Sequence, residues 1–255
     1  MLVLFGDSYA SESNSESDLS DYPKTTEHSS WFSMLADDLG IEYKTYGEPG
    51  SSFEYSTLKF FEYLTSNEYN PFDHIVFVLT MDDRSPIVAE EFAPKWASLA
   101  SPKVFPEYLD TDLKQQIGKL TDSDKHYARF KNFYRDWYLV QNKNLILAQR
   151  YMLLRTLHSL PNKTVSISVG ESETPIAKHF PKHADFSLLQ VTDGEILDGG
   201  IREYVRKYGT EDFRLNHLHE KNHHVLKDAV YAGLTVGDLS DFSASSFHKN
   251  LFSVK

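Results

Sequence analysis

The chain has 255 residues, of which 40% are hydrophobic, and its formal net charge is −11 at pH 7. This length and apolar content are enough for one sizeable core, so we expect a single domain over residues 1–255. The absence of cysteine excludes disulfides, thiolate zinc sites and cysteine nucleophiles. The negative charge opposes binding to nucleic acid or to an anionic membrane, because both require a positive protein surface.

The sequence predicts neither a membrane span nor an export signal. It has no run of about twenty apolar residues, the length that a membrane-spanning helix needs. Its N-terminus lacks a basic region followed by an apolar block and a small-residue cleavage site. We therefore expect a soluble chain that is cytoplasmic by default, and delivery by some other machinery stays open.

Short apolar runs alternate along the chain with longer segments of helical spacing. The predicted strands are Leu2–Phe5, Ile41–Tyr46, His74–Thr80, Thr164–Val169 and Phe186–Val191. The predicted helices include "SSWFSMLADDLG", for which Gly40 is the expected C-terminal stop, and "SSFEYSTLKFFEYLTS". Strands separated by helices predict an α/β fold with a mostly parallel central sheet and helices on both faces.

Residues from about 85 to 160 form a longer connection than one crossover helix needs. The connection begins with several prolines and becomes the aromatic-rich stretch "ARFKNFYRDWYLVQNKNLILAQRYMLLRTL", whose spacing is helical. We predict a helical insertion packed against or over the sheet, and a separate cap domain is the alternative. Its aromatic side chains are expected to form core rather than a ligand cage.

The first candidate site is Gly6, Asp7 and Ser8, directly after the first predicted strand. Ligands of open parallel sheets bind at the carboxyl ends of the strands, so Ser8 is expected at the functional edge. A following helix N-terminus would add N–H donors where negative charge develops in acyl transfer. Ser8 is therefore a candidate nucleophile. All three residue types also favour turns, so a purely structural turn is the alternative.

The segments "LVLFGDSYA", "SSWFSMLADDLG" and "YGEPGSS" resemble the opening blocks of the SGNH/GDSL hydrolase family in kind, order and approximate spacing. The resemblance covers about the first fifty-five residues, with short patches near positions 80 and 215. It implies a flavodoxin-like three-layer fold and esterase or lipase chemistry. It also implies that Ser8 attacks the acyl carbon, while the backbone N–H groups of Ser8 and Gly50 donate to the oxyanion. Gly47 matches the second-block glycine less well.

The third block of that family supplies an asparagine to the oxyanion hole, and this chain has "VLTMDDRSP" at that place. Asp82 is the nearest positional match, but an ionised carboxylate would repel an oxyanion. Two arrangements would restore a donor. Asp82 could be held protonated, or Arg84 could donate while pairing with Asp82 or Asp83. A solvated acidic loop whose arginine pairs locally is the structural alternative.

The fourth block of the family has an aspartate three residues before a histidine, whereas this chain has "EDFRLNHLHEKNHH", in which Leu215 stands three residues after Asp212. His217 lies five residues after Asp212, which is a longer spacing than the family uses. We predict His217 as the general base and Asp212 as the residue that orients it. Orientation by Asn216 and a Ser–His dyad stay open.

The same segment contains His219 and His223 in the pattern H-E-x-x-H, which on a helix places two zinc ligands on one face. Helical phasing puts both histidines on the side of Leu226 and Val230, so a hydrogen-bonded core pair also explains them, and in a segment this rich in histidine such a motif arises readily by chance. Asp228, Asp241 and His248 are the candidate third ligands, and none has the spacing of a known zinc motif. We keep a zinc hydrolase as the second alternative.

Together these patterns predict a metal- and cofactor-independent esterase with Ser8, His217 and Asp212 as catalytic residues, and with Gly50, Asp82 and Arg84 around the oxyanion and substrate. Carbohydrate O-acetyl groups and other small esters are the expected substrates. The alternative is a catalytically inactive fold that binds a protein partner within a larger assembly. The segment "SVGESETP" is expected at the substrate edge, with no assigned role.

Overall fold

The computed structural model describes residues 1–11, 30–48, 51–79, 85–87, 97–99, 143–168, 179–184, 218, 220–239, 242 and 244–248. Five parallel strands form its main sheet, in the order β2-β1-β3-β6-β7. The strands are β1 (Leu2–Phe5), β2 (Tyr43–Thr45), β3 (His74–Leu79), β6 (Lys163–Ser168) and β7 (His183–Ala184). This strand order is that of flavodoxin-like sheets, and the predicted α/β class is confirmed.

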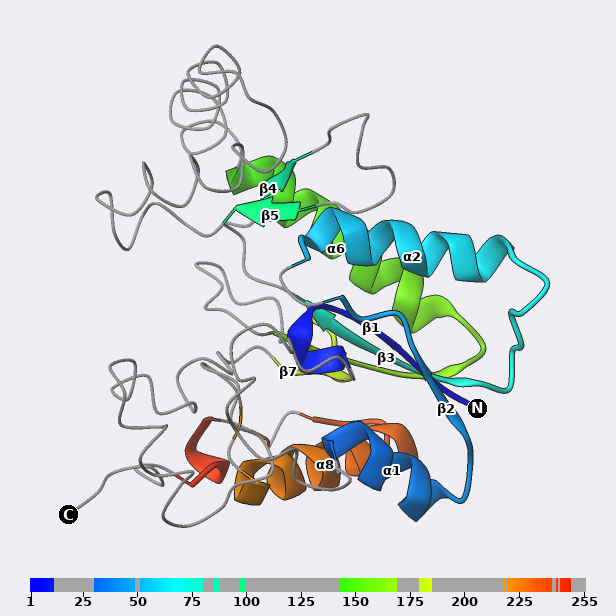
Figure 1. Ribbon diagram of the computed structural model, residues 1–255, viewed down its shortest axis with the longest axis vertical. Coiled ribbons are helices and arrows are strands. Elements are labelled where there is room, and N and C mark those ends of the chain that lie inside the picture. The colour runs from blue at the N-terminus through cyan, green and yellow to red at the C-terminus, as the bar shows by residue number, and fades with distance from the viewer. Residues whose placement is uncertain are drawn as a thin grey trace, which may run out of the picture.

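Helices cover both faces of the sheet (Figure 1). One layer contains α2 (Phe53–Thr65) and α6 (Lys143–Ser159), and the other contains α1 (Trp31–Leu39) and α8 (Glu220–Thr235). A 3-10 helix, η8 (Ala244–Ser246), follows α8. Each face of the sheet has its own core cluster of buried apolar side chains. The three layers follow from β1, in which all four side chains are apolar and fully buried.

The alternation of β1 divides its side chains between the two cores. Leu2 and Leu4 belong to the cluster with α1 and α8, and Val3 and Phe5 belong to the cluster with α2 and α6. Phe5 also stacks on Tyr46, which follows β2, with ring centroids 5.1 Å apart. The register pairs Phe5, the last residue of β1, with Phe77, so β3 continues to Leu79 beyond the end of β1.

Both predicted N-terminal helices are present, and Gly40 ends the first of them as predicted. Ser30 caps α1 by accepting from the N–H of Ser33, and Ser52 caps α2 by accepting from the N–H of Tyr55. Gly40 follows α1 in the left-handed conformation, and its N–H donates to Asp37 at 3.0 Å. These signals are local, which is why the sequence locates both helices.

Other elements differ from the prediction. β2 is three residues shorter than the predicted strand, and β7 is a two-residue strand that was not predicted. The predicted strand at residues 186–191 lies outside the described residues. Most of the predicted insertion also lies outside them, but its last seventeen residues before Leu160 form α6, which packs on β6 as a crossover helix. Two unpredicted strands, β4 (Ser85–Ile87) and β5 (Ala97–Leu99), pair antiparallel.

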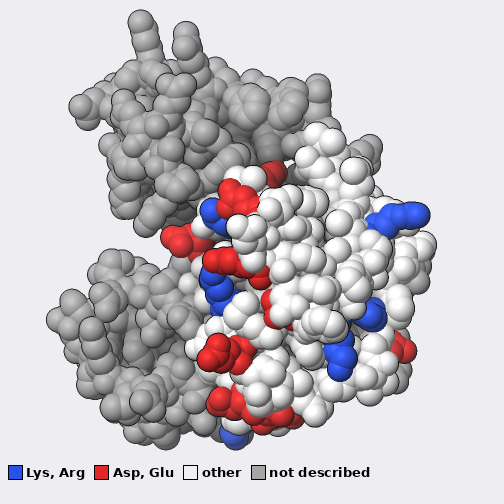
Figure 2. All heavy atoms as spheres, turned by 90° about the vertical axis from the view of Figure 1, so that its right-hand side faces the viewer, with Lys and Arg blue, Asp and Glu red and all other residues white. Residues whose placement is uncertain are grey.

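The surface of the described part carries charges of both signs. Figure 2 shows acidic and basic side chains interspersed on one face. Three ion pairs join such groups, namely Lys44 with Glu68, Lys59 with Glu62 and Lys227 with Asp38, at 2.6 to 2.7 Å. Exposed pairs of this kind contribute little to stability. None of the described helices is long and apolar enough to cross a membrane.

Candidate functional site

The turn that carries Ser8 lies at the carboxyl end of β1, as the sequence predicts. Ser8 begins a 3-10 helix, η1 (Ser8–Ala10), and Ser8 is 9% exposed. Gly6, two residues before Ser8, lies against Val78 of β3. A Cβ at Gly6 would lie 2.8 Å from the Cβ of Val78, so this contact requires glycine. The sharp turn after β1 therefore depends on the contact between Gly6 and β3.

Asp7 holds the turn through hydrogen bonds. Its carboxylate accepts from the N–H of Tyr9 at 3.1 Å, and its carbonyl accepts from the N–H of Ala10 at 3.0 Å. Asp7 is fully buried. This role was not predicted from the sequence, although an aspartate just before a helical turn is a common N-cap. Asp7 thus serves as the cap of the turn that presents Ser8.

The last residue of β2 and the segment that follows this strand pack against the same turn. The side chain of Ser51 donates to the carbonyl of Gly6 at 3.2 Å, and Thr45 donates to the carbonyl of Ala10. Gly47 lies so close to the turn that a Cβ there would overlap the carbonyl group of Ala10. Gly47, the weaker match to the family's second block, is therefore a packing glycine. Gly50, the better match, lies outside the described residues.

Helix α1 contacts the turn from the other side. The indole N–H of Trp31 donates to the carbonyl of Tyr9 at 2.9 Å, and the backbone N–H of Trp31 donates to Nδ1 of His223 at 3.2 Å. Trp31 and His223 are 1% and 3% exposed. The inward orientation predicted for His223 is confirmed, together with that of Leu226 and Val230, which are both fully buried.

The partners of the zinc alternative are only partly described. Nδ1 of His223 accepts a hydrogen bond, so the neutral ring carries its proton on Nε2. Asp228 is largely exposed and pairs with Lys227 at 2.8 Å, and the backbone N–H of His248 donates to the side chain of Asn222 at 2.9 Å. His219 and Asp241 lie outside the described residues. Among the residues that the structure does describe, no three His, Asp or Glu side chains form a group that could hold a metal ion.

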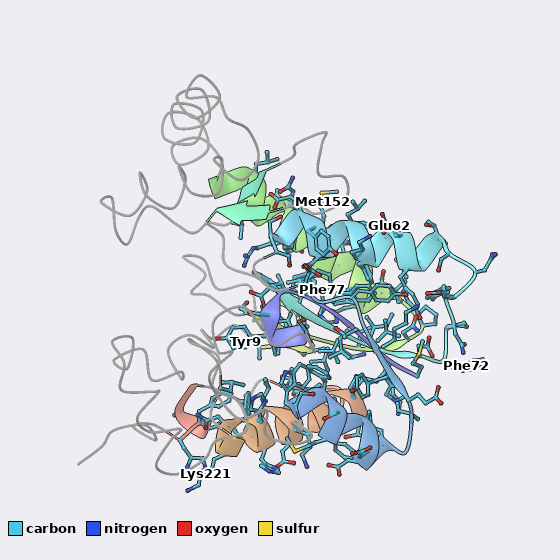
Figure 3. The ribbon with its side chains drawn as sticks, in the orientation of Figure 1. Tyr9, Glu62, Phe72, Phe77, Met152 and Lys221 are labelled. Carbon is cyan, nitrogen blue, oxygen red and sulfur yellow. The ribbon has the colours of Figure 1, made fainter. Side chains whose placement is uncertain are left out.

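Several other predicted site residues also fall outside the described part of the chain. They are Gly50, Asp82, Asp83, Arg84, residues 170–174, Asp212, Asn216 and His217. Leu218, the residue after His217, is described and is 1% exposed. It belongs to the same core cluster as Tyr9, the residue after Ser8. In Figure 3, Tyr9 and Lys221, which is near the start of α8, lie on the left of the described part, and Phe72 lies on its right.

Comparisons of the chain with protein-family models, with curated proteins and with solved structures find no match.

A second polar cluster lies under α6 and was missed by the sequence analysis. Nε2 of His158 lies 3.0 Å from Oγ of Ser166, and that oxygen lies 2.9 Å from Nδ1 of His183. Nδ1 of His158 lies 3.0 Å from Oγ1 of Thr164, and Nε2 of His183 lies 3.4 Å from Oγ of Ser168. These five side chains form one chain of hydrogen bonds, which we call the histidine–serine chain.

Burial keeps both histidines of this chain neutral. It lowers the pKa of His158 to about 4, with a smaller effect from the charge of Lys182. Burial, with smaller effects from positive charge at His158 and Arg150, lowers the pKa of His183 to about 3. One sequence signal was available, because Thr164, Ser166 and Ser168 put hydroxyl groups on one face of a strand that is otherwise apolar.

Buried Arg150 on α6 and half-buried Glu54 on α2 lie in the same layer. Arg150 is 3% exposed, and its guanidinium carbon lies 5.4 Å from the ring centroid of Phe53. Burial raises the pKa of the Glu54 carboxyl group, while the charge of Arg150 opposes that change. Because Phe53 and Glu54 open α2, they lie at the carboxyl edge of the sheet, where this helix starts.

Proposed function

We propose that this protein is a serine esterase of the SGNH type, acting on carbohydrate O-acetyl groups or other small esters, with Ser8 as the nucleophile. The observation that carries the proposal is the turn of Ser8, which follows a buried central strand and is held by hydrogen bonds from Ser51, Thr45 and Trp31. A nucleophile must be fixed to react quickly, because orientation supplies much of the rate. An ordinary surface turn has no need of such support.

The position of Leu218 supports the choice of base. It shares the core cluster of Tyr9, so the residues that follow His217 and Ser8 pack into one core. In the proposed reaction His217 accepts the proton of Ser8 as its oxygen attacks the acyl carbon, and Asp212 orients the imidazole. His217 then returns the proton to the leaving alcohol. Water, activated by the same imidazole, releases the acid from the acyl-enzyme.

The backbone N–H groups of Ser8 and Gly50 are the proposed donors to the oxyanion, and Arg84 with Asp82 is proposed beside the substrate. The oxyanion forms only as the tetrahedral intermediate forms. Donors placed beside it therefore lower the free energy of the transition state more than that of the bound substrate. In the absence of the family's asparagine, a guanidinium donor would favour an anionic substrate.

The test is hydrolysis of p-nitrophenyl acetate by the wild-type protein, by Ser8→Ala and by the control Ser33→Ala, each with and without EDTA. We expect Ser8→Ala to lose at least about 10³-fold in kcat, because the nucleophile is gone. Ser33→Ala and EDTA should leave the rate within about twofold of wild type.

Other outcomes would contradict the proposal. Equal rates for Ser8→Ala and wild type would remove Ser8 as the nucleophile. Loss of activity to EDTA alone would favour the zinc alternative with His219 and His223. Failure of the wild type both to hydrolyse the ester and to react with a fluorophosphonate probe would favour the inactive binding fold with a protein partner.

A further inference from the structure

The N-terminus of α1 is capped by a residue of another helix. The first N–H groups of a helix have no acceptor within it. Ser30 accepts from the N–H of Ser33, and the N–H of Trp31, the first residue of α1, donates to Nδ1 of His223 on α8. The two bonded residues are 192 positions apart in the sequence. His223 therefore ties the start of α1 to α8 within the core.

Trp31 passes this constraint to the turn of Ser8. Its indole N–H donates to the carbonyl of Tyr9 at 2.9 Å, and its ring packs edge-on against Phe32 at 5.5 Å between centroids. With its backbone N–H and its indole N–H both bonded, Trp31 cannot change rotamer without breaking one of these bonds. A displacement of Trp31 would therefore move Tyr9 and, with it, Ser8.

The hydrogen bond at His223 also fixes the state of its ring. Nδ1 must keep a lone pair to accept from Trp31, so the neutral imidazole carries its proton on Nε2. A side chain with an acceptor near the position of Nδ1 could replace the imidazole. The amide oxygen of asparagine satisfies this requirement, whereas a leucine side chain of similar bulk does not.

We propose that His223 is a positioning residue for Ser8 and acts through Trp31. This inference rests on the proposed function. Helix α8 begins at Glu220, three residues after the proposed base His217. The link from His223 through Trp31 to Tyr9 thus ties the segment that follows the base to the turn that carries the nucleophile, and so fixes their separation. Loss of the link would slow the attack of Ser8 while leaving substrate binding in place.

The first test compares His223→Leu with His223→Asn, using the exposed neighbour His224→Leu as the control. We expect His223→Leu to lower kcat by about 10- to 100-fold with KM within about twofold, because misplaced reacting groups lose rate at this scale. His223→Asn should recover most of the lost kcat, and His224→Leu should match wild type. An equal loss in His223→Asn and His223→Leu would overturn the inference, since the acceptor would then have no special role.

The second test asks whether the effect passes through Trp31. Trp31→Phe keeps an aromatic ring but removes the donor to Tyr9. We expect it to lower kcat as much as His223→Leu does, and we expect the double variant to be no slower than either single variant, because residues that act through one link are not additive. Additive losses in kcat would overturn the proposed route.

Hydrogen–deuterium exchange separates this inference from the proposed function, because it needs no substrate. The amides of Tyr9 and Ala10 are hydrogen-bonded to Asp7, so they report directly on the turn. We expect them to exchange about tenfold faster in His223→Leu than in wild type, and near the wild-type rate in His223→Asn. Unchanged exchange in His223→Leu would refute the positioning role. Failure of the fluorophosphonate probe to label Ser8 in wild type, with exchange as expected, would instead refute the proposed function.

Discussion

Acidification should destabilise the protein through the histidine–serine chain. The pKa of His158 is about 4 and that of His183 about 3 in the folded protein, against an ordinary value of about 6.5 in the unfolded chain. As the pH falls below about 6.5, the two imidazoles bind protons in the unfolded chain but stay unprotonated in the folded protein. The stabilisation is therefore complete above pH 6.5 and is lost progressively as the pH falls toward the folded values.

The magnitude follows from the same pKa values. As the pH falls from about 7 to 4.5, proton uptake on unfolding rises toward one proton per histidine, which lowers the free energy of unfolding by about 2–3 kcal/mol per histidine, or roughly 5 kcal/mol for the pair. This is a large part of the total stability of an ordinary domain. Carboxylates contribute to the same pH range, so the test must compare variants rather than the wild type alone.

The assay is urea unfolding followed by tryptophan fluorescence at several pH values between about 7 and 4.5. His158→Gln and His183→Gln keep hydrogen-bonding groups but do not titrate. Each should lose about 2–3 kcal/mol less stability over this range than wild type, whatever its stability at pH 7. The control His179→Gln removes an exposed histidine and should follow wild type. If all four proteins lose stability in parallel, the two buried histidines do not remain neutral as argued.

Two further substitutions test the packing around the sheet. Gly6→Ala should cost about 2–4 kcal/mol of unfolding free energy, because its Cβ would lie 2.8 Å from that of Val78. A melting temperature equal to wild type would show that β1 and β3 can separate there. Tyr63→Phe removes the donor, at 2.7 Å, to buried Asp73, which also pairs with the ammonium group of Met1, and should cost about 1–2 kcal/mol by urea unfolding. Unchanged stability would mean that Met1 and its neighbours satisfy Asp73 without Tyr63.

The sequence predicted the elements whose signals are local. The apolar run Leu2–Phe5 is β1 residue for residue, Gly40 ends α1 as expected, and both quoted helical segments form helices. β7 was missed because it has only two residues, one of them a polar histidine. Its place in the sheet comes from pairing with β6, where Ser166 lies opposite His183. No local sequence pattern predicts the pairing of β7 with β6.

The surroundings of Ser8 were predictable only in part. Its place after β1 followed from the sequence, and so did the inward side of His223. The bond between His223 and Trp31 joins residues 192 positions apart, and the contact of Gly47 with Ala10 depends on the arrival of β2 beside β1. The histidine–serine chain likewise forms only when α6, β6 and β7 pack together. These contacts are properties of the assembled fold, and the sequence shows only the hydroxyl face of β6 in advance, not the partners that it meets.

The place of β1 in the sheet has a consequence for how the chain is made. β1 lies between β2 and β3, and both of those strands follow it in the sequence, ending at Thr45 and Leu79. At the usual pace of translation, the roughly 75 residues from β1 to the end of β3 take about 4–15 s to synthesise. Throughout that time a fully apolar strand has at least one open edge, where it can pair with other chains. The strand that carries the candidate nucleophile can therefore aggregate until β3 is synthesised. Chaperone binding to the nascent chain before that point would protect this strand from aggregation.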